Sequence, residues 1–337
     1  MIEITKEYNF SEHSIFLNSE IDITIENINY ACEIIGLEKI KSINEYYQNI
    51  RQVLDAENIK KCLSFKNKNI YLNYLKNELS KKRYYTEYFI KTLPVKNNFL
   101  YRMIPLYYEG KVTEKPLYKN SIKTGRQSIE SGFNFLTLKK DLRKKLTTVK
   151  NHTLFEIDFV SCEPNFYFNS ILNENIGTKN IYEYISKKFD LKVDIKKFKN
   201  GLIAMLYGAA DNTITKISGV KKEKITEIKQ YMQVEKFKKR IENEFKNNSM
   251  FLNFYKRPIL DISNPVNYWI QSSVADYCCL AFNQFLNENS YLRIHAFIHD
   301  AIIVSCPNQN IQSLLSIDII HENISNIAMP VRIKEVS

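Results

Sequence analysis

The feature that most limits what this chain can fold into is a short hairpin near its C-terminal end. Two apolar, β-rich runs, residues 292–298 and 301–304, flank the dipeptide His299-Asp300. Runs of this kind separated by two residues predict antiparallel strands joined by a tight turn. The sequence therefore places a carboxylate at the tip of a buried hairpin.

A second carboxylate stands at the end of another predicted strand. Residues 153–159 read Thr-Leu-Phe-Glu-Ile-Asp-Phe, a strand that ends at Asp158 and leads into a helix from about Glu163 or Pro164. If the two strands are neighbours in one sheet, Asp158 and Asp300 project to one spot, and paired carboxylates bind Mg²⁺. Either aspartate alone would more often be a turn or capping residue. The prediction depends on the pair and on the residues around it.

Positive charge is concentrated in one part of the chain. The 337 residues carry a net charge of +11, and residues 51–150 hold 23 Lys and Arg against 8 Asp and Glu. A local excess of this size suits a phosphate backbone. Lys-rich, Asn-rich and Ile-rich usage also follows from an AT-rich genome, so charge alone leaves nucleic-acid binding open.

Several classes of protein are disfavoured. No apolar run approaches the ~20 residues of a membrane span, and residues 1–7 lack the apolar core of a signal peptide. The six cysteines show no CxxC spacing and there are only 5 histidines, which argues against zinc. These features predict a cytoplasmic protein with reduced, mostly buried thiols and no membrane partner.

The remaining periodic segments are mostly helical. Amphipathic helices are expected at residues 21–35, 43–54 and 70–93. Further helices are expected at 180–189 and 194–207, over the polar, charged stretch 221–248, and at 266–286, which is rich in Ala, Ser and Cys. Residues 100–150 are predicted to be irregular, with turns at Gly110, Gly125 and Gly132. Residues 330–336 are predicted to form a final strand.

Five short motifs occur in a recognisable order. They are Thr124-Gly125-Arg126, then Asp158 followed by Glu163, then Lys199 followed by Tyr207-Gly208, then Asn267 with Gln271 and Asp276, and last Ile298-His299-Asp300-Ala301. Together they resemble the conserved segments of family A (DNA polymerase I-like) DNA polymerases, including motifs A, B and C. Any one motif is weak. All five in the family's order, from about residue 120 onward, make the resemblance specific.

The resemblance implies a fold and a domain plan. The fold would be α+β, a right-hand polymerase with an antiparallel palm sheet, helical fingers and a short helical thumb. Residues 1–120 would form an N-terminal helical region and reduced thumb, and residues 121–337 the palm, with fingers inserted at about 170–250. About 120 residues before the first motif leave no space for exonuclease domains, so proofreading is expected to be missing.

The resemblance also implies metal and nucleotide sites. Asp158 and Asp300, with the Phe159 carbonyl, would hold two Mg²⁺ ions, for which Mn²⁺ can substitute. The residues implied for the nucleotide are Lys199, Lys196 and Tyr182 near the phosphates, Glu163 beside the sugar 2′ carbon and Tyr207 near the template base. From the sequence alone, Lys199 could instead lie on a solvated helix face, Glu163 could simply face the helix dipole, and Tyr182 stays open.

A further set of residues is implied for nucleic-acid binding. Arg126 and Gln271 would bond to minor-groove acceptors that all correct base pairs share, supported by Asn267. His299 would touch the primer end, although a lone histidine is more often structural. Lys140 falls where the family has a second Arg.

The chain departs from the family pattern at several positions. Ile195 stands where the family has an Arg in the fingers, and Lys196 follows one position later. Ile203 stands where the family has an aromatic residue. Ala301 replaces the acid after the motif C aspartate, and Asn165 stands where an Arg is usual. These changes predict weaker triphosphate binding or an altered nucleotide preference.

The expected function is template-directed DNA synthesis: addition of dNTPs to a primer 3′ end by two-metal-ion nucleotidyl transfer, without proofreading. Its partners would be primer-template nucleic acid and dNTPs. Residues 1–100 carry no recognisable motif and could bind a protein partner. Two alternatives remain: an RNA-extending, rNTP-using or template-independent nucleotidyltransferase on the same fold, or an inactive nucleic-acid-binding relative.

Overall fold

The computed structural model describes residues 29, 88, 91–121, 124–176, 180–248 and 250–336. The chain divides into two compact units, residues 1–87 and 88–337, and the second contains nearly all of the described residues. The helices predicted over 21–35 and 43–54, and most of 70–93, lie outside the described residues. The predicted N-terminal helical region and thumb therefore stay predictions.

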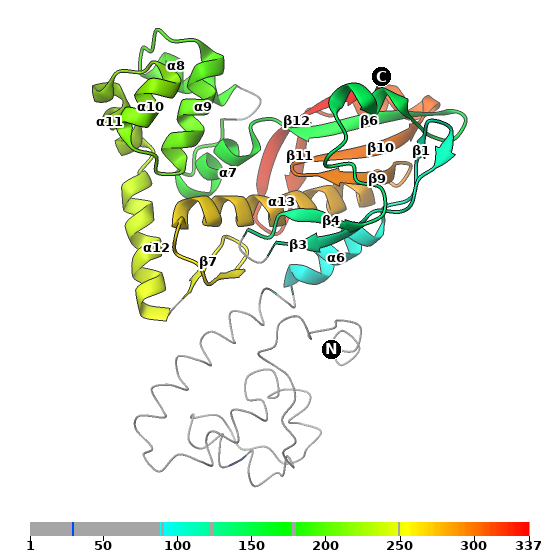
Figure 1. The fold of residues 1–337 in the computed structure, drawn as a ribbon, viewed down its shortest axis with the longest axis horizontal. Helices are drawn as coiled ribbons and strands as arrows, with labels where there is room; N and C mark the ends of the chain where they lie inside the picture. The colour runs from blue at the N-terminus through cyan, green and yellow to red at the C-terminus, as the bar shows by residue number, and fades with distance from the viewer. Residues whose placement is uncertain are drawn as a thin grey trace. The chain divides into compact units, whose positions relative to one another are not determined.

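A five-stranded antiparallel sheet forms the centre of the second unit (Figure 1). Its order is β11 (Ile319–Glu322), β12 (Ile327–Glu335), β6 (His152–Phe159), β10 (Ala301–Pro307) and β9 (Arg293–Ile298). Every neighbouring pair is antiparallel. The two predicted aspartate-bearing strands are adjacent, and the predicted final strand covers the other side of β6. These predictions are confirmed.

The two faces of the sheet differ in chemistry because strand residues alternate in direction. On β6, Phe155, Ile157 and Phe159 are 2%, 0% and 1% exposed and belong to the main core. The alternate residues Glu156 and Asp158 are half-buried. One face of β6 therefore packs in the main core. The other carries Glu156 and Asp158 beside Leu154, which belongs to a second buried cluster.

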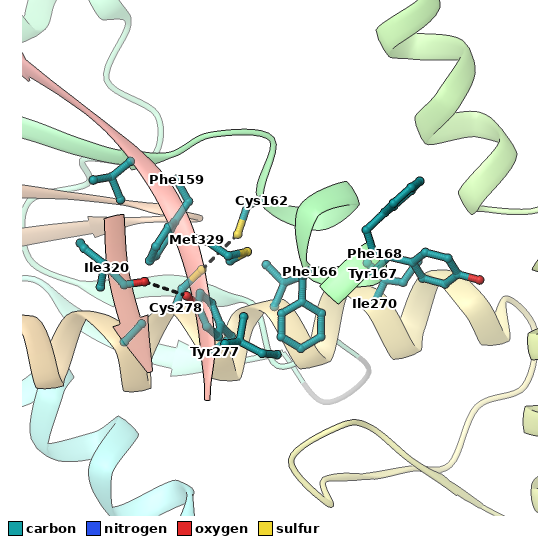
Figure 2. Close-up of a cluster of buried hydrophobic side chains, with 14 of the residues drawn as sticks. Phe159, Cys162, Phe166, Tyr167, Phe168, Ile270, Tyr277, Cys278, Ile320 and Met329 are labelled. Atoms are coloured by element: carbon teal, nitrogen blue, oxygen red, sulfur yellow. Dashed lines mark hydrogen bonds between the residues drawn. The ribbon is translucent and has the colours of Figure 1, made fainter. Parts of the chain in front are cut away.

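The packed face is covered by α13 (Pro265–Glu288), a 24-residue helix that begins with proline in its first turn. It contacts α6 (Leu93–Tyr101), α7 (Cys162–Ile171) and β11. Figure 2 shows aromatic side chains filling this layer. The hydroxyl of Tyr277 donates to the carbonyl oxygen of Ile320 across 3.4 Å. The layer thus fixes α13 and α7 against the sheet.

The described cysteines also lie in the core. Cys162, Cys278, Cys279 and Cys306 are all buried and free, as predicted. The sulfur atoms of Cys162 and Cys278 are 3.6 Å apart, where α7 meets α13 (Figure 2). Cys32 and Cys62 lie outside the described residues.

Five helices connect α7 to α13, and α8–α11 gather beside α7, at the left in Figure 1. They are α8 (Ile181–Lys188), α9 (Ile195–Leu206), α10 (Asp211–Ser218), α11 (Lys222–Tyr231) and α12 (Val234–Asn248). Asn180 and Asp194 begin α8 and α9 because their side chains accept hydrogen bonds from backbone N–H groups of the first turn. The stretch predicted as helical over 221–248 is two helices, since Gln233 adopts a φ of 53° between them.

Residues 100–150 are more ordered than predicted. They contain the short strands β1 (Tyr107–Tyr108), β2 (Lys111–Val112), β3 (Leu117–Asn120), β4 (Gln127–Ser131) and β5 (Leu146–Thr147), and the 3₁₀ helix η4 (Lys140–Lys145). The predicted turns at Gly110, Gly125 and Gly132 are confirmed by φ values of 77°, 61° and 84°. Smaller elements complete the unit: β7 (Phe251–Leu252), β8 (Pro258–Ile259), η5 (Asn308–Asn310) and α14 (Ile311–Leu315).

None of the helices in the described part of the chain has both the length and the apolar character that a membrane crossing requires.

Candidate active site

Two carboxylates are brought together where β6 ends and the β9–β10 hairpin turns. Asp158 pairs with Ala301, so Asp300 lies one position beyond it along the same ladder. The backbone N–H of Phe159 donates to the carbonyl oxygen of Asp300 across 3.1 Å. His299 adopts a φ of 59°, which allows the two-residue connection. The sheet register therefore brings the backbone of Asp300 next to Asp158 and Phe159 at the end of the ladder.

The electrostatics of the pair show that the two charges are close. The pKa of Asp158 is raised to about 6, first by desolvation and then by repulsion from Asp300 and Glu156. The pKa of Asp300 is also raised, chiefly by desolvation and then by Glu163. Without a cation, both carboxylates are thus held in a site that disfavours their charged forms.

This donor set fits a hard divalent ion. Two partly desolvated carboxylates gain from a cation between them, and Mg²⁺ normally takes its remaining ligands from water and substrate phosphates. Among the described residues, no group of three or more His, Cys, Asp or Glu side chains could hold a metal. Phe159 lies next to both aspartates, and the role of its carbonyl stays a prediction.

A lysine on α9 faces the carboxylate pair. The positive charge of Lys199 lowers the pKa of both Asp158 and Asp300, against the larger effects that raise them. Its Nζ lies 5.7 Å from the centroid of the Tyr182 ring on α8, within range of a cation–π contact. Lys196 is exposed one turn earlier on the same helix. The structure thus groups Lys199 with Tyr182 opposite the aspartates.

Four further predicted residues form one hydrogen-bonded network. An Arg126 Nη atom lies 2.5 Å from Glu163 Oε1, and the Tyr207 hydroxyl donates to the other Glu163 oxygen. The Gln271 side-chain amide donates to the Tyr207 hydroxyl across 3.4 Å. Segments around β4, α7, α9 and α13 therefore meet at Glu163, whose side chain is 17% exposed.

The other predicted residues lie at the edges of this site. Asn267 is half-buried one turn before Gln271 on α13, and His299 is exposed at the hairpin tip. The pKa of His299 is lowered by desolvation and then by Arg126 and Arg143, so the ring is neutral at pH 7. Lys140 begins η4, but its side chain is outside what the structure describes.

Sequence reasoning missed several residues. Arg332 on β12 pairs with Asp158 and lowers the pKa of that carboxyl. The alternation Val331-Arg332-Ile333-Lys334 could have placed Arg332 on the carboxylate face once β12 was assigned beside β6. Lys96 and Arg257, which donate to the backbone carbonyl groups of Gly125 and Ser121, carry no local sequence signal. Asn165, where an Arg is usual, donates from Nδ2 to the Val160 carbonyl across 2.6 Å and so has a structural contact.

The sequence matches no family model and no curated protein. The structure does match a solved one: the POL domain of Pol1 from M. smegmatis, a family A DNA polymerase, in complex with a DNA primer-template and a dNTP. The TM-score is 0.51 and the identity 15%; the match covers 99% of this chain and 66% of the other. The predicted mixed α+β polymerase fold is thereby confirmed at the level of fold, and the chain spans less than two thirds of that structure.

Proposed function

We propose that this chain, which has the fold of a DNA polymerase domain, is a template-directed DNA polymerase that extends a primer 3′ end with dNTPs. The observation that carries the proposal is the side-by-side placement of Asp158 and Asp300, with the charge of Lys199 acting on both. A carboxylate pair opposite a cation suits a metal-bound triphosphate.

The reaction would join a primer to a nucleotide without a covalent enzyme intermediate. The primer 3′ hydroxyl loses its proton to solvent and its oxygen attacks the α-phosphorus of a dNTP. The bond from that phosphorus to the β-bridging oxygen breaks, and pyrophosphate leaves. When bound, the two Mg²⁺ ions would activate the 3′ hydroxyl and neutralise the leaving group. The chain's own part is to hold the reactants in position.

Each element of the site then has a task. Asp158 and Asp300 would hold the metals, and Lys199 would bind triphosphate oxygens from α9, with Lys196 and Tyr182 nearby. Helices α8–α12 would serve as the fingers. Metal binding would offset the desolvation and the repulsion from Asp300 that raise the pKa of Asp158.

The polar network would read the nascent pair. Glu163, fixed by Arg126 and Tyr207, would occupy the space beside the sugar 2′ carbon and favour dNTPs. Arg126 and Gln271 would donate to minor-groove acceptors, with Asn267 in support and His299 at the primer end. Arg126 keeps spare donors for this, since its side chain is 44% exposed and a guanidinium has five N–H groups.

The experiment is primer extension by the purified full chain with Mg²⁺ or Mn²⁺. Separate dNTP and rNTP pools, each with and without template, distinguish the proposed activity from RNA synthesis and from untemplated addition. The variants Asp158→Asn and Asp300→Asn should abolish extension, while the same change at the exposed Asp318 should leave it intact. Full activity in Asp300→Asn would reject the proposal.

Proofreading is tested on a primer with a mismatched 3′ end. The proposed enzyme extends such primers slowly or leaves them intact. Efficient removal of the mismatched nucleotide by the wild-type chain would contradict this part of the proposal.

A further inference from the structure

A buried ionic cluster lies beneath the segment that carries Arg126. Lys96 on α6 and Asp276 on α13 both have side chains that are 0% exposed, and Lys96 Nζ lies 2.8 Å from Asp276 Oδ1. Arg257, just before β8, lies 3.6 Å from the same oxygen. Asn253 donates to Asp276 Oδ2 across 2.8 Å. Two cations thus share one carboxylate in the core.

Both cations also bind the main chain next to Arg126. Lys96 Nζ donates to the Gly125 carbonyl oxygen across 3.0 Å. Arg257 Nη2 donates to the Ser121 carbonyl oxygen across 3.1 Å. Ser121 and Arg126 are themselves joined by a backbone hydrogen bond of 2.8 Å. The cluster therefore fixes the backbone immediately before Arg126 at two separate carbonyl groups.

Packing against Gly125 tightens this arrangement. A Cβ atom at Gly125 would lie 1.9 Å from Arg257 Nη1, so only glycine lets the guanidinium approach this closely. The Arg257 side chain is held in turn by the Tyr88 hydroxyl at 3.2 Å. The guanidinium therefore serves as a rigid support for the Thr124–Arg126 segment.

The charge count argues that support of this segment is the purpose of the cluster. A buried ion pair costs desolvation energy that one partner of opposite charge can at best offset. Here a second buried cation is added. Besides the Tyr88 hydroxyl, the side chains of Lys96 and Arg257 donate to the backbone carbonyl groups of Gly125 and Ser121. Asp276 also lies on the helix that carries Gln271, so α13 supports both ends of the network around Glu163.

We infer that Lys96, Asp276 and Arg257 are positioning residues that hold Arg126 in place for contact with the primer-template. The inference deepens the proposed function and rests on it. None of the three touches the reacting atoms; they act through the backbone of Arg126.

A double-mutant cycle on primer-template affinity tests this role. In Lys96→Met, Asp276 keeps Arg257 as a partner of opposite charge. The Gly125 carbonyl group also keeps a hydrogen bond, because it still accepts from Gln127 Nε2 at 2.9 Å. The full chain with this change should fold and bind a primed duplex roughly tenfold more weakly by fluorescence anisotropy. In an Arg126→Ala background the same change should have no further effect. Equal losses in both backgrounds would overturn the inference.

A charge-conserving variant keeps the test independent of folding. Arg257→Lys retains the positive charge but cannot bind Ser121, Tyr88 and Asp276 together. It should weaken binding of the primed duplex severalfold, again only when Arg126 is present. A wild-type affinity in Arg257→Lys would count against the inference even if Lys96→Met did not fold.

A matched control separates positioning from general destabilisation. Leu314 on α14 is 0% exposed and lies outside the cluster. Leu314→Ala should lower the melting temperature while leaving duplex affinity unchanged. Primer extension by the wild-type chain is measured in parallel. If the wild-type chain binds the duplex but does not extend the primer, the proposed function is rejected. If the wild-type chain extends primers and Lys96→Met binds the duplex with wild-type affinity, only the positioning role is rejected.

Discussion

Arg332 on β12 stands directly opposite Asp158 on β6 in the antiparallel ladder. Its positive charge lowers the pKa of Asp158, while desolvation, Asp300 and Glu156 raise it to about 6. Arg332 therefore helps to keep Asp158 ionised at neutral pH.

Extension activity should fall as the pH drops through about 6. Asp158 gains a proton in this range, and a protonated carboxyl is a poor metal ligand. Because protons and Mg²⁺ compete for the same oxygens, a higher Mg²⁺ concentration should move the acid limb to lower pH. The measurement is the pH profile of kcat/KM for the dNTP at two Mg²⁺ concentrations. If the acid limb lies at the same pH at both concentrations, the assignment of Asp158 as a metal ligand is contradicted.

Within this profile, Arg332→Gln should move the acid limb to higher pH, because it removes a charge that favours ionised Asp158. Lys334→Gln is the matched control. Lys334 lies two residues further along β12, opposite Glu156 instead of Asp158, and its removal should move the limb less.

Asp158→Asn should stabilise the fold at pH 7 while abolishing activity. The folded-state pKa of Asp158 is raised, so its charged form opposes folding above about pH 4 and the penalty is complete above about pH 6. Allowing for solvent screening of this half-buried group, the gain should be roughly 1–2 kcal/mol at pH 7. Urea unfolding at pH 7 and at pH 3.5 checks it: the difference between variant and wild type should vanish at the lower pH.

Lys199→Met should raise the KM for dNTP by about tenfold or more, because it removes the cation that we propose binds the triphosphate. Affinity for the primed duplex should change little. Lys197→Met on the same helix is the control: two residues away, it lies on a different side of α9 and is also exposed. Equal effects of the two changes on KM would show that only the general charge of α9 matters.

Gly125→Ala should destabilise the second unit by about 3 kcal/mol or more. The new methyl group would displace Arg257 from Ser121 and Tyr88 and would also strain a φ of 61°. Gly110→Ala should lower the free energy of unfolding by only about 1 kcal/mol, the cost of backbone strain at a φ of 77°. No atom lies within 4 Å of the added Cβ. The two variants are compared by urea midpoint, and similar midpoints would argue against the support role of Arg257.

The elements that sequence alone predicted well are those with strong local signals. The hairpin around His299-Asp300 combines apolar strands with a two-residue turn, and α13 is a long apolar run that begins at Pro265. Residues 194–207 begin at a capping aspartate and end at Tyr207, which bounds α9 almost to the residue. Local chemistry determined each of these elements.

Where partners are distant in sequence, prediction was weaker. The strands β1 and β5 have two residues each and exist because they pair with one another. Nothing in the residues around Lys96 marks it as buried, yet its side chain is fully buried and pairs with Asp276, 180 residues away. The break at Gln233 and the short helix α10 also lacked a distinctive pattern. Such features appear only when tertiary contacts are known.

The placement of β6 between β10 and β12 has a consequence for how the protein is made. About 140 residues separate β6, which carries Asp158, from β10, the first of its two ladder partners to be synthesised. Until then its backbone N–H and C=O groups are exposed as open strand edges, which invite pairing with other chains. Vectorial synthesis thus delays assembly of the carboxylate pair until the β9–β10 hairpin has been translated.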